Sequence, residues 1–385
     1  MTMKKSMIVG FDAKRVLRNG TGLGSYGRTL VNSLPAAEGG MELLLYAPDE
    51  GRDDLRRQVQ LRPGVRIVCP EGLRFRLQRD WWRSHGIVKQ LKSDGVSLYH
   101  GLSGELPFGL RAAGIPGIVT IHDLIFLRHP EYYNWIDVQI YKRKFLHTLR
   151  EADRIIAISE CTKRDILHYG SFPADRIDVV YQSCSQRFRQ PVSEAALREV
   201  ASRYRLPQRY VLNVGTIEER KNVLLAVRAL QQLPQDVHLV VVGRRTRYAD
   251  RVQKYIESHG LAGRVSFLHG VPDAHLYAIY RGAECFVYPS RYEGFGIPVI
   301  EAIQSGLPVV ACTGSCLEEA GGDSCLYVAP DDVGGMAAAI GHSLQGSEGR
   351  EQRVAAGLAY IARFENSDIA AQVVEEYHKV LRGRQ

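Results

Sequence analysis

The sequence has no long hydrophobic run and no cysteine pattern typical of a metal centre. Its longest apolar stretches, such as VHLVVVG at 237–243, are far shorter than the roughly 20 residues that a bilayer-spanning helix needs. Seven cysteines are scattered without a C-x-x-C pair or a histidine at zinc spacing, so we expect reduced thiols. No secretory signal peptide is recognisable near the N-terminus. These absences predict a cytoplasmic protein, soluble or peripheral on the membrane.

Positive charge is concentrated in the N-terminal half. Residues 1–190 contain 29 Lys and Arg against 20 Asp and Glu, whereas residues 191–385 contain 21 against 22. The densest part, residues 73–92, has six cations, one acid and the adjacent Trp81 and Trp82. Cations beside indoles suit an anionic membrane surface or a lipid-phosphate acceptor, but a solvated helix with core tryptophans would have the same composition. No nucleic-acid-binding motif accompanies the charge, so we expect no nucleic-acid partner.

Short β-branched runs alternate with longer amphipathic stretches along the whole chain. This alternation predicts an α/β protein with two parallel sheets covered by helices. A polar stretch at 186–208 separates two series of strands, so we expect an N-terminal domain at 1–190 and a second domain at 191–365. The expected strands are MIVGFDA, ELLLYAP, VRIVCP, VSLYHG, GIVTIHD, RIIAIS, DVVYQS, YVLNVGT, VHLVVVG, RVSFLHG, CFVYPS and PVVACT.

Charged residues follow two of the expected strands in the second domain. In doubly wound sheets, ligands bind at the carboxyl ends of the strands. Arg220 and Lys221 follow YVLNVGT at the start of a helical stretch, where fixed charge and free backbone N–H groups favour a phosphate. After CFVYPS, Glu293 precedes a glycine turn and Glu301 lies about one turn into the next helix. Two carboxylates in this arrangement can accept hydrogen bonds from sugar or ribose hydroxyls.

The segment NGTGLGSYGR at 19–28 has the G-x-G-x-x-G spacing of a dinucleotide site, with Gly22, Gly24 and Gly27. A dinucleotide site also needs its first glycine directly after the strand and an acid at the end of the second strand, about 20 residues on. Here the strand ends near Ala13 and the acid is missing at that place. The spacing therefore matches a dinucleotide site but its placement does not, and the resemblance described below implies instead a mobile glycine loop that closes over the ligand.

Longer stretches of the chain resemble the glycosyltransferases of family four, including their E-x7-E element from Glu293 to Glu301. This family comprises retaining enzymes of the GT-B fold, with two Rossmann-like domains facing a cleft. The N-terminal stretches GTGLGSYGRTL, LYHGLSGELP and TIHDLIFLRHPEYY are similar to the mannosyltransferase B-like branch. The C-terminal stretches that carry the resemblance are NVGTIEERKN, VVGR, FLHGVPDAHLYAIYRGAECFVYPSRYEGFGIPVIEAIQSGLPVV and CLEEAGGDSCLYVAPDD.

The resemblance implies a role for each matching position. Arg220 and Lys221 match the diphosphate-binding pair, Glu301 the glutamate that holds the ribose, and Glu293 the glutamate near the donor sugar. His122 matches a histidine that contacts the hydroxyls of the donor sugar. The catalytic candidates are therefore Glu293, His122, Arg220 and Lys221. The positions expected to bind the nucleotide sugar are Gly22, Gly24, Gly215, Thr216, Arg220, Lys221, Gly243, Phe295, Gly296, Ile297 and Glu301.

The implied reaction leaves a nucleoside diphosphate, whose growing negative charge must be neutralised by a metal or by protein cations. The sequence has no D-x-D triplet, the usual metal handle of other glycosyltransferases. We therefore expect Arg220 and Lys221 to supply the charge, with no metal and no other cofactor. Retention would result from front-face attack, in which the leaving phosphate helps to deprotonate the acceptor. Glu293 would then position and stabilise the reacting groups rather than form a covalent bond.

The resemblance also suggests partners. Its branch favours GDP-mannose as the donor and a saccharide or lipid-linked acceptor in cell-surface polysaccharide synthesis. The composition of residues 73–92, rather than the resemblance, suggests an anionic membrane surface as one of its two alternatives. Two other functions stay open: a nucleotide-sugar 2-epimerase on the same fold, and a non-catalytic nucleotide-sugar-binding subunit. Release of nucleoside diphosphate on addition of an acceptor distinguishes the three.

The end of the chain and the domain junction carry two further expectations. Residues 365–381 have helical spacing of apolar side chains, and in this fold the last helix, 366–385 here, crosses back to the first domain. The stretch YQSCSQRF at 181–188 departs from the small glycine-containing turn that relatives usually have. This departure leaves the geometry of the hinge open.

Overall fold

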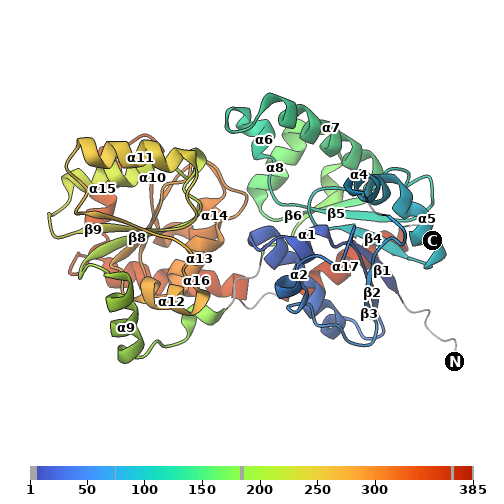
Figure 1. The fold of residues 1–385 in the computed structure, drawn as a ribbon, viewed down its shortest axis with the longest axis horizontal. Helices are drawn as coiled ribbons and strands as arrows, with labels where there is room; N and C mark the ends of the chain where they lie inside the picture. The colour runs from blue at the N-terminus through green and yellow to red at the C-terminus, as the bar shows by residue number, and fades with distance from the viewer. Residues whose placement is uncertain (1–6, 74, 183–185, 366–367, 384–385) are drawn as a thin grey trace. The chain divides into compact units, whose positions relative to one another are not determined.

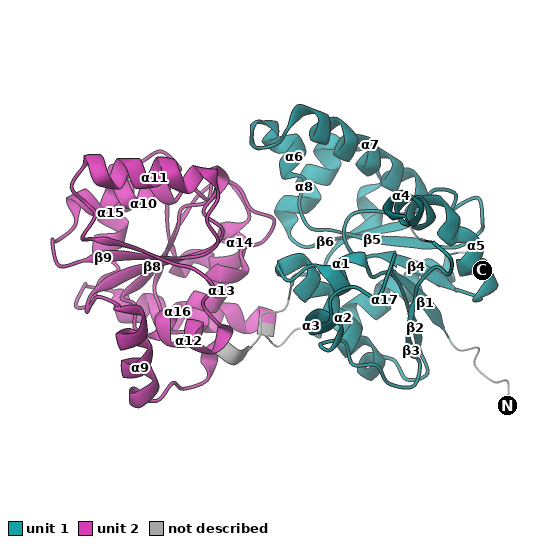
Figure 2. Ribbon diagram, in the orientation of Figure 1, with its two compact units in different colours: residues 1–182, 368–385 teal, residues 183–367 magenta. Residues whose placement is uncertain are grey.

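The chain forms two compact units. Unit 1 comprises residues 1–182 and 368–385, and unit 2 comprises residues 183–367 (Figure 2). Each unit is a parallel sheet between two layers of helices (Figure 1). The computed structural model describes residues 7–73, 75–182, 186–365 and 368–383.

The division between the units falls after residue 182, whereas the sequence predicted a boundary at 190. The stretch 186–208, expected as the junction, belongs to unit 2 instead. The physical reason is Phe188, which is buried and packs edge to face against Tyr277 and Tyr280. Part of the departing stretch YQSCSQRF lies outside the described residues.

The sheet of unit 1 has seven strands in the order β3-β2-β1-β4-β5-β6-β7, and every neighbouring pair is parallel. Each strand corresponds to one of the seven runs predicted for this half of the chain. The strands are β1 (Ile8–Asp12), β2 (Glu42–Tyr46), β3 (Val65–Val68), β4 (Leu98–Gly101), β5 (Gly117–Ile121), β6 (Arg154–Ala157) and β7 (Ile177–Val179).

Helices cover both faces of this sheet. Figure 1 shows α6, α7 and α8 on one side and α1, α2 and α17 on the other. The helices are α1 (Lys14–Arg18), α2 (Gly22–Ala37), α3 (Asp53–Arg56), α4 (Arg76–Trp81), α5 (Ile87–Ser93), α6 (Ile125–Arg128), α7 (Trp135–Glu151), α8 (Glu160–Tyr169) and α17 (Ile369–Arg382), with the short turns η1 (Trp82–Gly86), η2 (Pro130–Tyr132) and η3 (Ala174–Arg176). Within the described residues, no helix is long and apolar enough to cross a bilayer.

Helix α17 joins the core of unit 1, although it follows unit 2 in the chain. Its residues Val373, Val374 and Tyr377 are buried in the same cluster as Val9 and Phe11 of β1. The apolar side chains at helical spacing within residues 365–381 form the buried side of this helix. Burial of several apolar side chains makes α17 a structural part of unit 1 rather than an appendage.

The sheet of unit 2 has six parallel strands in the order β10-β9-β8-β11-β12-β13. Five were predicted from the sequence, and β13 was missed because it is a half-buried run of only three residues, too short to show a period. The strands are β8 (Tyr210–Val214), β9 (His238–Val242), β10 (Val265–Leu268), β11 (Cys285–Tyr288), β12 (Val309–Cys312) and β13 (Leu326–Val328).

The helices of unit 2 lie on both faces of its sheet, with α10, α11 and α15 on one side and α9, α12, α13 and α16 on the other (Figure 1). Helices α10, α11 and α15 pack on their face of the sheet through buried aliphatic side chains, among them Val227, Val252 and Ile340. The helices are α9 (Glu194–Tyr204), α10 (Val223–Ala229), α11 (Arg247–Ser258), α12 (Asp273–Arg281), α13 (Ile297–Gln304), α14 (Leu317–Gly321), α15 (Val333–Gly341) and α16 (Arg350–Glu365), with η4 (Gln186–Arg189), η5 (Glu219–Lys221), η6 (Leu230–Gln232) and η7 (Gly322–Ser324).

The order of strands reverses once in each sheet, between β1 and β4 in unit 1 and between β8 and β11 in unit 2. At such a switch point the loops that follow the two central strands turn to opposite faces and leave a crevice at the strands' carboxyl ends. Each unit therefore has one place where its fold favours a ligand.

The glycines at the start of α2 are helical rather than part of the loop that was predicted. Gly22 and Gly24 lie in the first turns of α2, and Gly24 is buried. A Cβ atom at position 24 would lie 1.8 Å from the carbonyl oxygen of Asn19, so this glycine allows α2 to pack against the preceding turn. Arg28 fastens the same turn, because its Nη1 donates to the carbonyls of Val16 at 2.8 Å and Asn19 at 2.9 Å.

Candidate active site

Arg220, Lys221 and Glu293 form one cluster in unit 2. Turn η5 follows β8, and Glu293 lies in the loop between β11 and α13. The Lys221 Nζ lies 2.5 Å from Glu293 Oε1, and the Arg220 Nη1 lies 2.9 Å from Glu293 Oε2. Because β8 and β11 are the neighbours at the switch point, loops 72 residues apart in sequence meet at one edge of the sheet.

Further polar groups hold both cations in place. Lys221 Nζ donates to the Tyr288 hydroxyl at 2.6 Å, and Arg220 Nη1 donates to the carbonyl of Tyr292 at 2.6 Å. Arg220 also pairs with Glu218, whose side chain is 37% exposed, whereas the Glu293 side chain is only 10% exposed. The cluster thus contains two cations and two carboxylates, of which Glu293 is the more buried.

The charges of the cluster stabilise one another. Burial alone would raise the pKa of Glu293, but Lys221 and Arg220 outweigh it and lower that pKa to about 2. Burial would lower the pKa of Lys221, yet the charge of Glu293 raises it above its ordinary value. All three groups are therefore ionised at neutral pH. Fixed cations at the end of a strand can neutralise an anionic ligand without rearranging first.

Two glycines shape the backbone beside this cluster. A Cβ atom at Gly243, directly after β9, would lie 1.8 Å from the carbonyl oxygen of Gly215, directly after β8, so only glycine fits there. A Cβ atom at Gly215 would lie 4.0 Å from the ring of Tyr288. The hydroxyl of this tyrosine accepts the hydrogen bond from Lys221. Gly215, Thr216 and Gly243 are thus together at the carboxyl ends of adjacent strands.

The loop that carries Glu293 is anchored to α13 and α14. Gly296 has a φ of 113° at the N-cap of α13, a conformation that favours glycine, and Ile297 begins the helix. Phe295 is buried, and the Cys316 thiol donates to its carbonyl at 2.9 Å. Sequence reasoning treated Cys316 only as a reduced thiol, and no signal in the sequence separates it from the other cysteines.

Glu301 lies one turn into α13, as the sequence predicted. Its Oε2 accepts from the hydroxyl of Tyr280 at 3.4 Å, and Tyr280 is fully buried on α12. The two glutamates of the E-x7-E element therefore have different surroundings. Glu293 is paired with cations, whereas Glu301 contacts a phenol.

The other predicted residues lie in unit 1. His122, directly after β5, is buried, and burial lowers its pKa to about 4, so the imidazole is neutral at pH 7. Its Nε2 donates to the carbonyl of Leu102 at 2.9 Å, and its Nδ1 accepts from Gln182 Nε2 at 2.9 Å. The ring of Tyr26 packs against it edge to face. Both ring nitrogens are thus engaged within unit 1.

A second histidine, which the sequence did not single out, connects the sheet to α17. His100 in β4 is fully buried, its Nδ1 lies 2.7 Å from the Tyr377 hydroxyl, and its Nε2 lies 2.9 Å from the Thr120 hydroxyl. Burial lowers the pKa of His100 to about 3. This neutral hydrogen-bonded histidine is a structural group. Its position within the run LYHG, facing a helix from the other end of the chain, gave no sequence signal.

The basic stretch 73–92 does not form one charged surface. Arg83 lies inside unit 1, with its Nη1 at 2.7 Å from Asp12 Oδ2 and its Nη2 at 2.5 Å from Glu105 Oε2, so this member of the basic stretch neither faces a membrane nor lies on a solvated helix face. Trp82 is buried, whereas Trp81 is 62% exposed. Arg74 lies outside the described residues.

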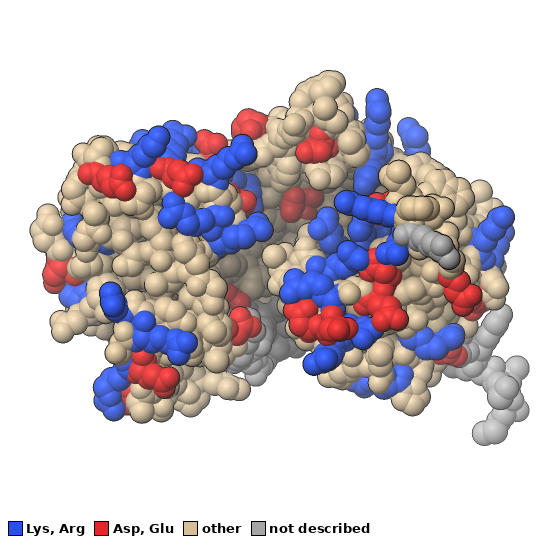
Figure 3. All heavy atoms as spheres, in the orientation of Figure 1, with Lys and Arg blue, Asp and Glu red and all other residues tan. Residues whose placement is uncertain are grey.

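Acidic partners reduce the free positive charge elsewhere in unit 1. On the face drawn in Figure 3, Asp and Glu side chains lie among the Lys and Arg side chains of this unit rather than apart from them. Arg79, for example, pairs with Asp49 at 3.2 Å, and Arg52 with Asp54 at 2.7 Å. Among the residues that the structure describes, no group of three or more His, Cys, Asp or Glu side chains is placed to hold a metal ion.

Two family models match the chain. The model described as "Glycosyl transferases group 1" matches residues 200–359, which include the cluster in unit 2. The model described as "Glycosyltransferase Family 4" matches residues 20–183, which include His122 and the start of α2. Together they cover most of both units.

Two bacterial proteins are similar in sequence. The chain is 32% identical to O-antigen chain mannosyltransferase B of Escherichia coli over 383 residues, which covers 93% of this chain and 96% of that protein. It is 29% identical to O-antigen chain mannosyltransferase RfbU of Salmonella typhimurium, over 58% of this chain and 59% of that protein. The first of these similarities extends through nearly the whole of both chains.

Solved structures share the fold. Sucrose-phosphate synthase of Thermosynechococcus elongatus superposes with a TM-score of 0.77 at 21% identity, covering 98% of this chain and all of that chain. HepE of Anabaena in complex with UDP-glucose has a TM-score of 0.75 at 17% identity, covering 97% of this chain and 99% of that chain. These likenesses, the two Rossmann-like units and the sequence matches show that the chain belongs to group 1 of the glycosyl transferases, within family four, and has the GT-B fold.

Proposed function

We propose that this glycosyltransferase transfers mannose from GDP-mannose, with retention and without a metal, to a saccharide or lipid-linked acceptor of a cell-surface polysaccharide. The observation that carries the proposal is the cluster of Arg220, Lys221 and Glu293 at the switch point of unit 2. The choice of mannose is supported by the names of the E. coli and S. typhimurium relatives.

The two cations have the main electrostatic role. As the bond between mannose and phosphate breaks, negative charge grows on the departing GDP, and Arg220 and Lys221 neutralise it. Glu293 holds both cations in fixed positions before the substrate binds. Glu293 is thus a positioning group that can also stabilise positive charge developing on the sugar. Retention follows if the acceptor attacks from the side of the leaving phosphate, which takes the acceptor's proton.

His122 has a different role. Its imidazole is neutral at pH 7, and its ring nitrogens bond to Leu102 and Gln182. We propose that it orients donor sugar hydroxyls, with the Gln182 contact giving way, and that it transfers no proton. We propose that the donor contacts the backbone of Gly22, Gly215, Thr216, Phe295, Gly296 and Ile297, and that Glu301 binds the ribose. Gly24 and Gly243 contribute indirectly, because they let the chain pack against the carbonyls of Asn19 and Gly215.

The test is release of GDP from GDP-mannose on addition of a mannosyl acceptor, in the presence of EDTA. Replacing Lys221 by Ala should lower turnover by about two orders of magnitude, the scale of losing one transition-state electrostatic donor. Lys254→Ala is the matched control, because Lys254 is an exposed lysine of the same unit. The anomeric configuration of the product, measured by NMR, tests retention.

Other outcomes would contradict the proposal in different ways. A strict metal requirement would contradict the role of the two cations, and near-normal turnover of the Lys221 variant would remove Lys221 from the mechanism. Conversion of the nucleotide sugar without an acceptor would indicate the epimerase. Binding of GDP-mannose without any turnover would indicate a non-catalytic subunit.

We also propose that unit 1 docks on anionic membrane through α4. Leu77 is 84% exposed, Phe75 is 68% exposed and Trp81 is 62% exposed. Beside them, the Arg76 side chain is 94% exposed. Arg76 forms an exposed ion pair with Asp80 at 3.7 Å. Exposed cations beside apolar and aromatic side chains are the composition of an interfacial helix. This patch is smaller than the stretch 73–92 from which it was predicted.

Sedimentation with liposomes tests the docking. Leu77→Ser and Arg76→Glu should each weaken binding to vesicles that contain an anionic lipid, and salt should weaken it further. Leu61→Ser is the control, since Leu61 is 56% exposed in unit 1 but lies outside α4. Equal binding by the wild type to neutral vesicles, or equal loss with the Leu61 variant, would contradict this proposal.

A further inference from the structure

The two ring nitrogens of His122 have different kinds of partner. Its Nε2 donates to the backbone carbonyl of Leu102, which lies directly after β4 and is only 1% exposed. Its Nδ1 accepts from the side-chain amide of Gln182, a half-buried residue in the stretch that follows β7. Gln182 is also the last residue of unit 1 before the chain enters unit 2. One partner is therefore part of the buried backbone, whereas the other is a side chain with three rotatable bonds.

The surroundings of the ring decide which nitrogen carries its hydrogen. A carbonyl oxygen can only accept, so Nε2 must be protonated to bond to Leu102. Burial lowers the pKa of His122 to about 4, so the ring holds only this one hydrogen at pH 7. Nδ1 is therefore an acceptor, and Gln182 meets it with an amide N–H at 2.9 Å. A sugar hydroxyl can donate to the same nitrogen.

Other contacts prevent the ring from turning toward a different partner. Tyr26 packs against it edge to face, with the ring centroids 4.9 Å apart, and the Tyr26 hydroxyl lies 3.3 Å from that of buried Thr120. The hydroxyl of Thr162 on α8 donates to the backbone carbonyl of His122 at 3.2 Å. Turning the ring would break its bond to Leu102 and its packing against Tyr26, whereas replacing Gln182 leaves both intact.

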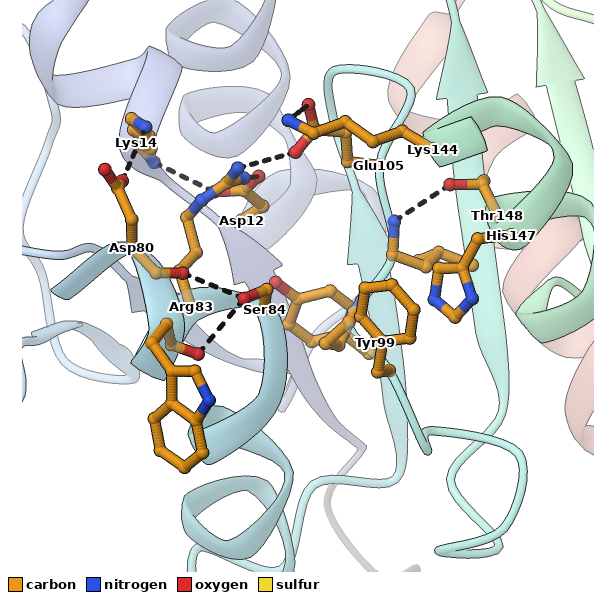
Figure 4. A pocket seen from close by; sticks show the side chains of 14 residues that line it. Asp12, Lys14, Asp80, Arg83, Ser84, Tyr99, Glu105, Lys144, His147 and Thr148 are labelled. Carbon is orange, nitrogen blue, oxygen red and sulfur yellow. Dashed lines mark hydrogen bonds and ion pairs between the residues drawn. The ribbon is translucent and has the colours of Figure 1, made fainter. Parts of the chain in front are cut away.

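A cavity of 200 Å³ is lined in part by His122, so a ligand can reach this residue. The other charged or titratable residues that line it are Arg15, Glu105, Asp123, Tyr133, Tyr141 and Lys144. Glu105 pairs with Arg83 and Lys144 (Figure 4), so its charge is already neutralised. Burial and the charge of Arg15 both lower the pKa of His122. These neighbours leave Nδ1 an acceptor for whichever donor meets it.

We infer that Gln182 takes the hydrogen-bonding position on His122 that a hydroxyl of the donor sugar needs, so that the sugar must displace it. Gln182 thus competes with the sugar, and because it acts through His122 it is a positioning residue rather than a catalytic one. Its place beyond the end of β7 lets its side chain leave without disturbing the sheet. This inference rests on the proposed function, which gives His122 the donor sugar to bind.

Two substitutions of Gln182 should change sugar binding in opposite directions. Gln182→Met has a similar length but no donor, so the Kd for GDP-mannose should fall about fivefold, the scale of one net hydrogen bond. Gln182→Glu presents a carboxylate, which favours a hydrogen on Nδ1 and removes the acceptor, so the Kd for GDP-mannose should rise. The Kd for GDP, which lacks the mannose, should not change in either variant.

Calorimetric titration of the full chain measures both dissociation constants. Gln139→Met and Gln139→Glu are the matched controls, because Gln139 is another half-buried glutamine of unit 1, on α7. The ring of His122 is observed separately by NMR of the chain with isotope-labelled histidine and no nucleotide, with His122→Gln to assign the signal. At pH 7, Nδ1 should be unprotonated in the wild type and protonated in Gln182→Glu.

Three results would overturn the inference. The first is an equal change in the Kd for GDP and for GDP-mannose, because Gln182 would then act on the fold rather than on the sugar. The second is GDP-mannose affinity that is unchanged or weaker in Gln182→Met. The third is an Nδ1 that stays unprotonated in Gln182→Glu.

Failure of the proposed function gives a different result. If the wild type binds UDP-glucose instead of GDP-mannose, GDP-mannose is rejected as the donor, and the Gln182 variants are compared with UDP-glucose and UDP. A tighter UDP-glucose complex in Gln182→Met, with UDP unaffected, would uphold the inference. An unchanged UDP-glucose complex would overturn it.

Discussion

Glu293 is a buried carboxylate that stays charged because Lys221 and Arg220 surround it. Each of the three was predicted singly from its place after a strand. Their pairing was not predicted, because a sequence shows that two loops lie at the same sheet edge but not which atoms meet. The resemblance assigned Glu293 to the donor sugar, whereas the structure shows its contacts with the two cations.

Replacing Glu293 by Gln should destabilise the protein in a pH-dependent way. The folded pKa of about 2 lies below the ordinary value of 4.5, so the charged form stabilises the fold fully above about pH 4.5. That contribution is lost as pH falls from 4.5 to 2. At pH 7 the variant should lose on the order of 3 kcal/mol, the cost of removing the carboxylate that pairs with buried Lys221 and one of the two that pair with Arg220.

Chemical unfolding of the wild type and the variant at pH 7, 5 and 3 provides the measurement. The difference in unfolding free energy should be largest at pH 7 and should narrow at pH 3. A difference that is independent of pH would mean that Glu293 acts through packing rather than charge. Glu218→Gln serves as a comparison, because its more exposed carboxylate should contribute less.

Arg83 shows where prediction from residues failed. A run of six cations and one acid suggested a charged surface, but the acids that neutralise Arg83 are Asp12, at the end of β1, and Glu105, after β4. Both are distant in sequence, and only the parallel register of β1 and β4 brings them together. The composition of residues 73–92 therefore showed the positive charge of the stretch but not the acidic side chains that neutralise Arg83.

At the scale of elements, strands were predictable because each is a short buried run with its own composition. All seven strands of unit 1 and five of the six in unit 2 follow from these runs. The start of α2 was not predictable in the same way. Glycines are typical of loops, yet here they permit a helix to begin close to the preceding turn, a tertiary contact without a local signal.

Two substitutions in the first turns of α2 separate these roles of glycine. Gly24→Ala should destabilise unit 1 by about 1–3 kcal/mol, since its Cβ would meet the Asn19 carbonyl at 1.8 Å. Gly22→Ala should leave stability unchanged or raise it by up to about 1 kcal/mol, because an added Cβ would meet nothing within 4 Å beyond its own helix and alanine favours the helix. Thermal denaturation of both variants is the measurement. Equal effects would mean that the packing of Gly24 is unimportant.

At the scale of the whole molecule, the chain leaves unit 1 at residue 182 and rejoins it at 368. Removing α17 should therefore destabilise unit 1, because Val373, Val374 and Tyr377 fill its core and Tyr377 bonds to His100. Hydrogen exchange of a chain that ends at 367 should show lost protection in β1 and α2, with protection in unit 2 retained. Loss confined to unit 2 would contradict this division of the chain.

This arrangement also affects the order of events during synthesis. The core of unit 1 stays open until α17 has been made, so the strands from β1 to β7 wait while the whole of unit 2 is translated. At about 5–20 residues per second, the delay is roughly 10–40 seconds. During that time Val9 and Phe11 have an incomplete cover, whereas unit 2 can fold as soon as it emerges. The first unit to be translated is thus the last to be completed. A chaperone that binds the nascent chain should therefore bind the incompletely covered core of unit 1.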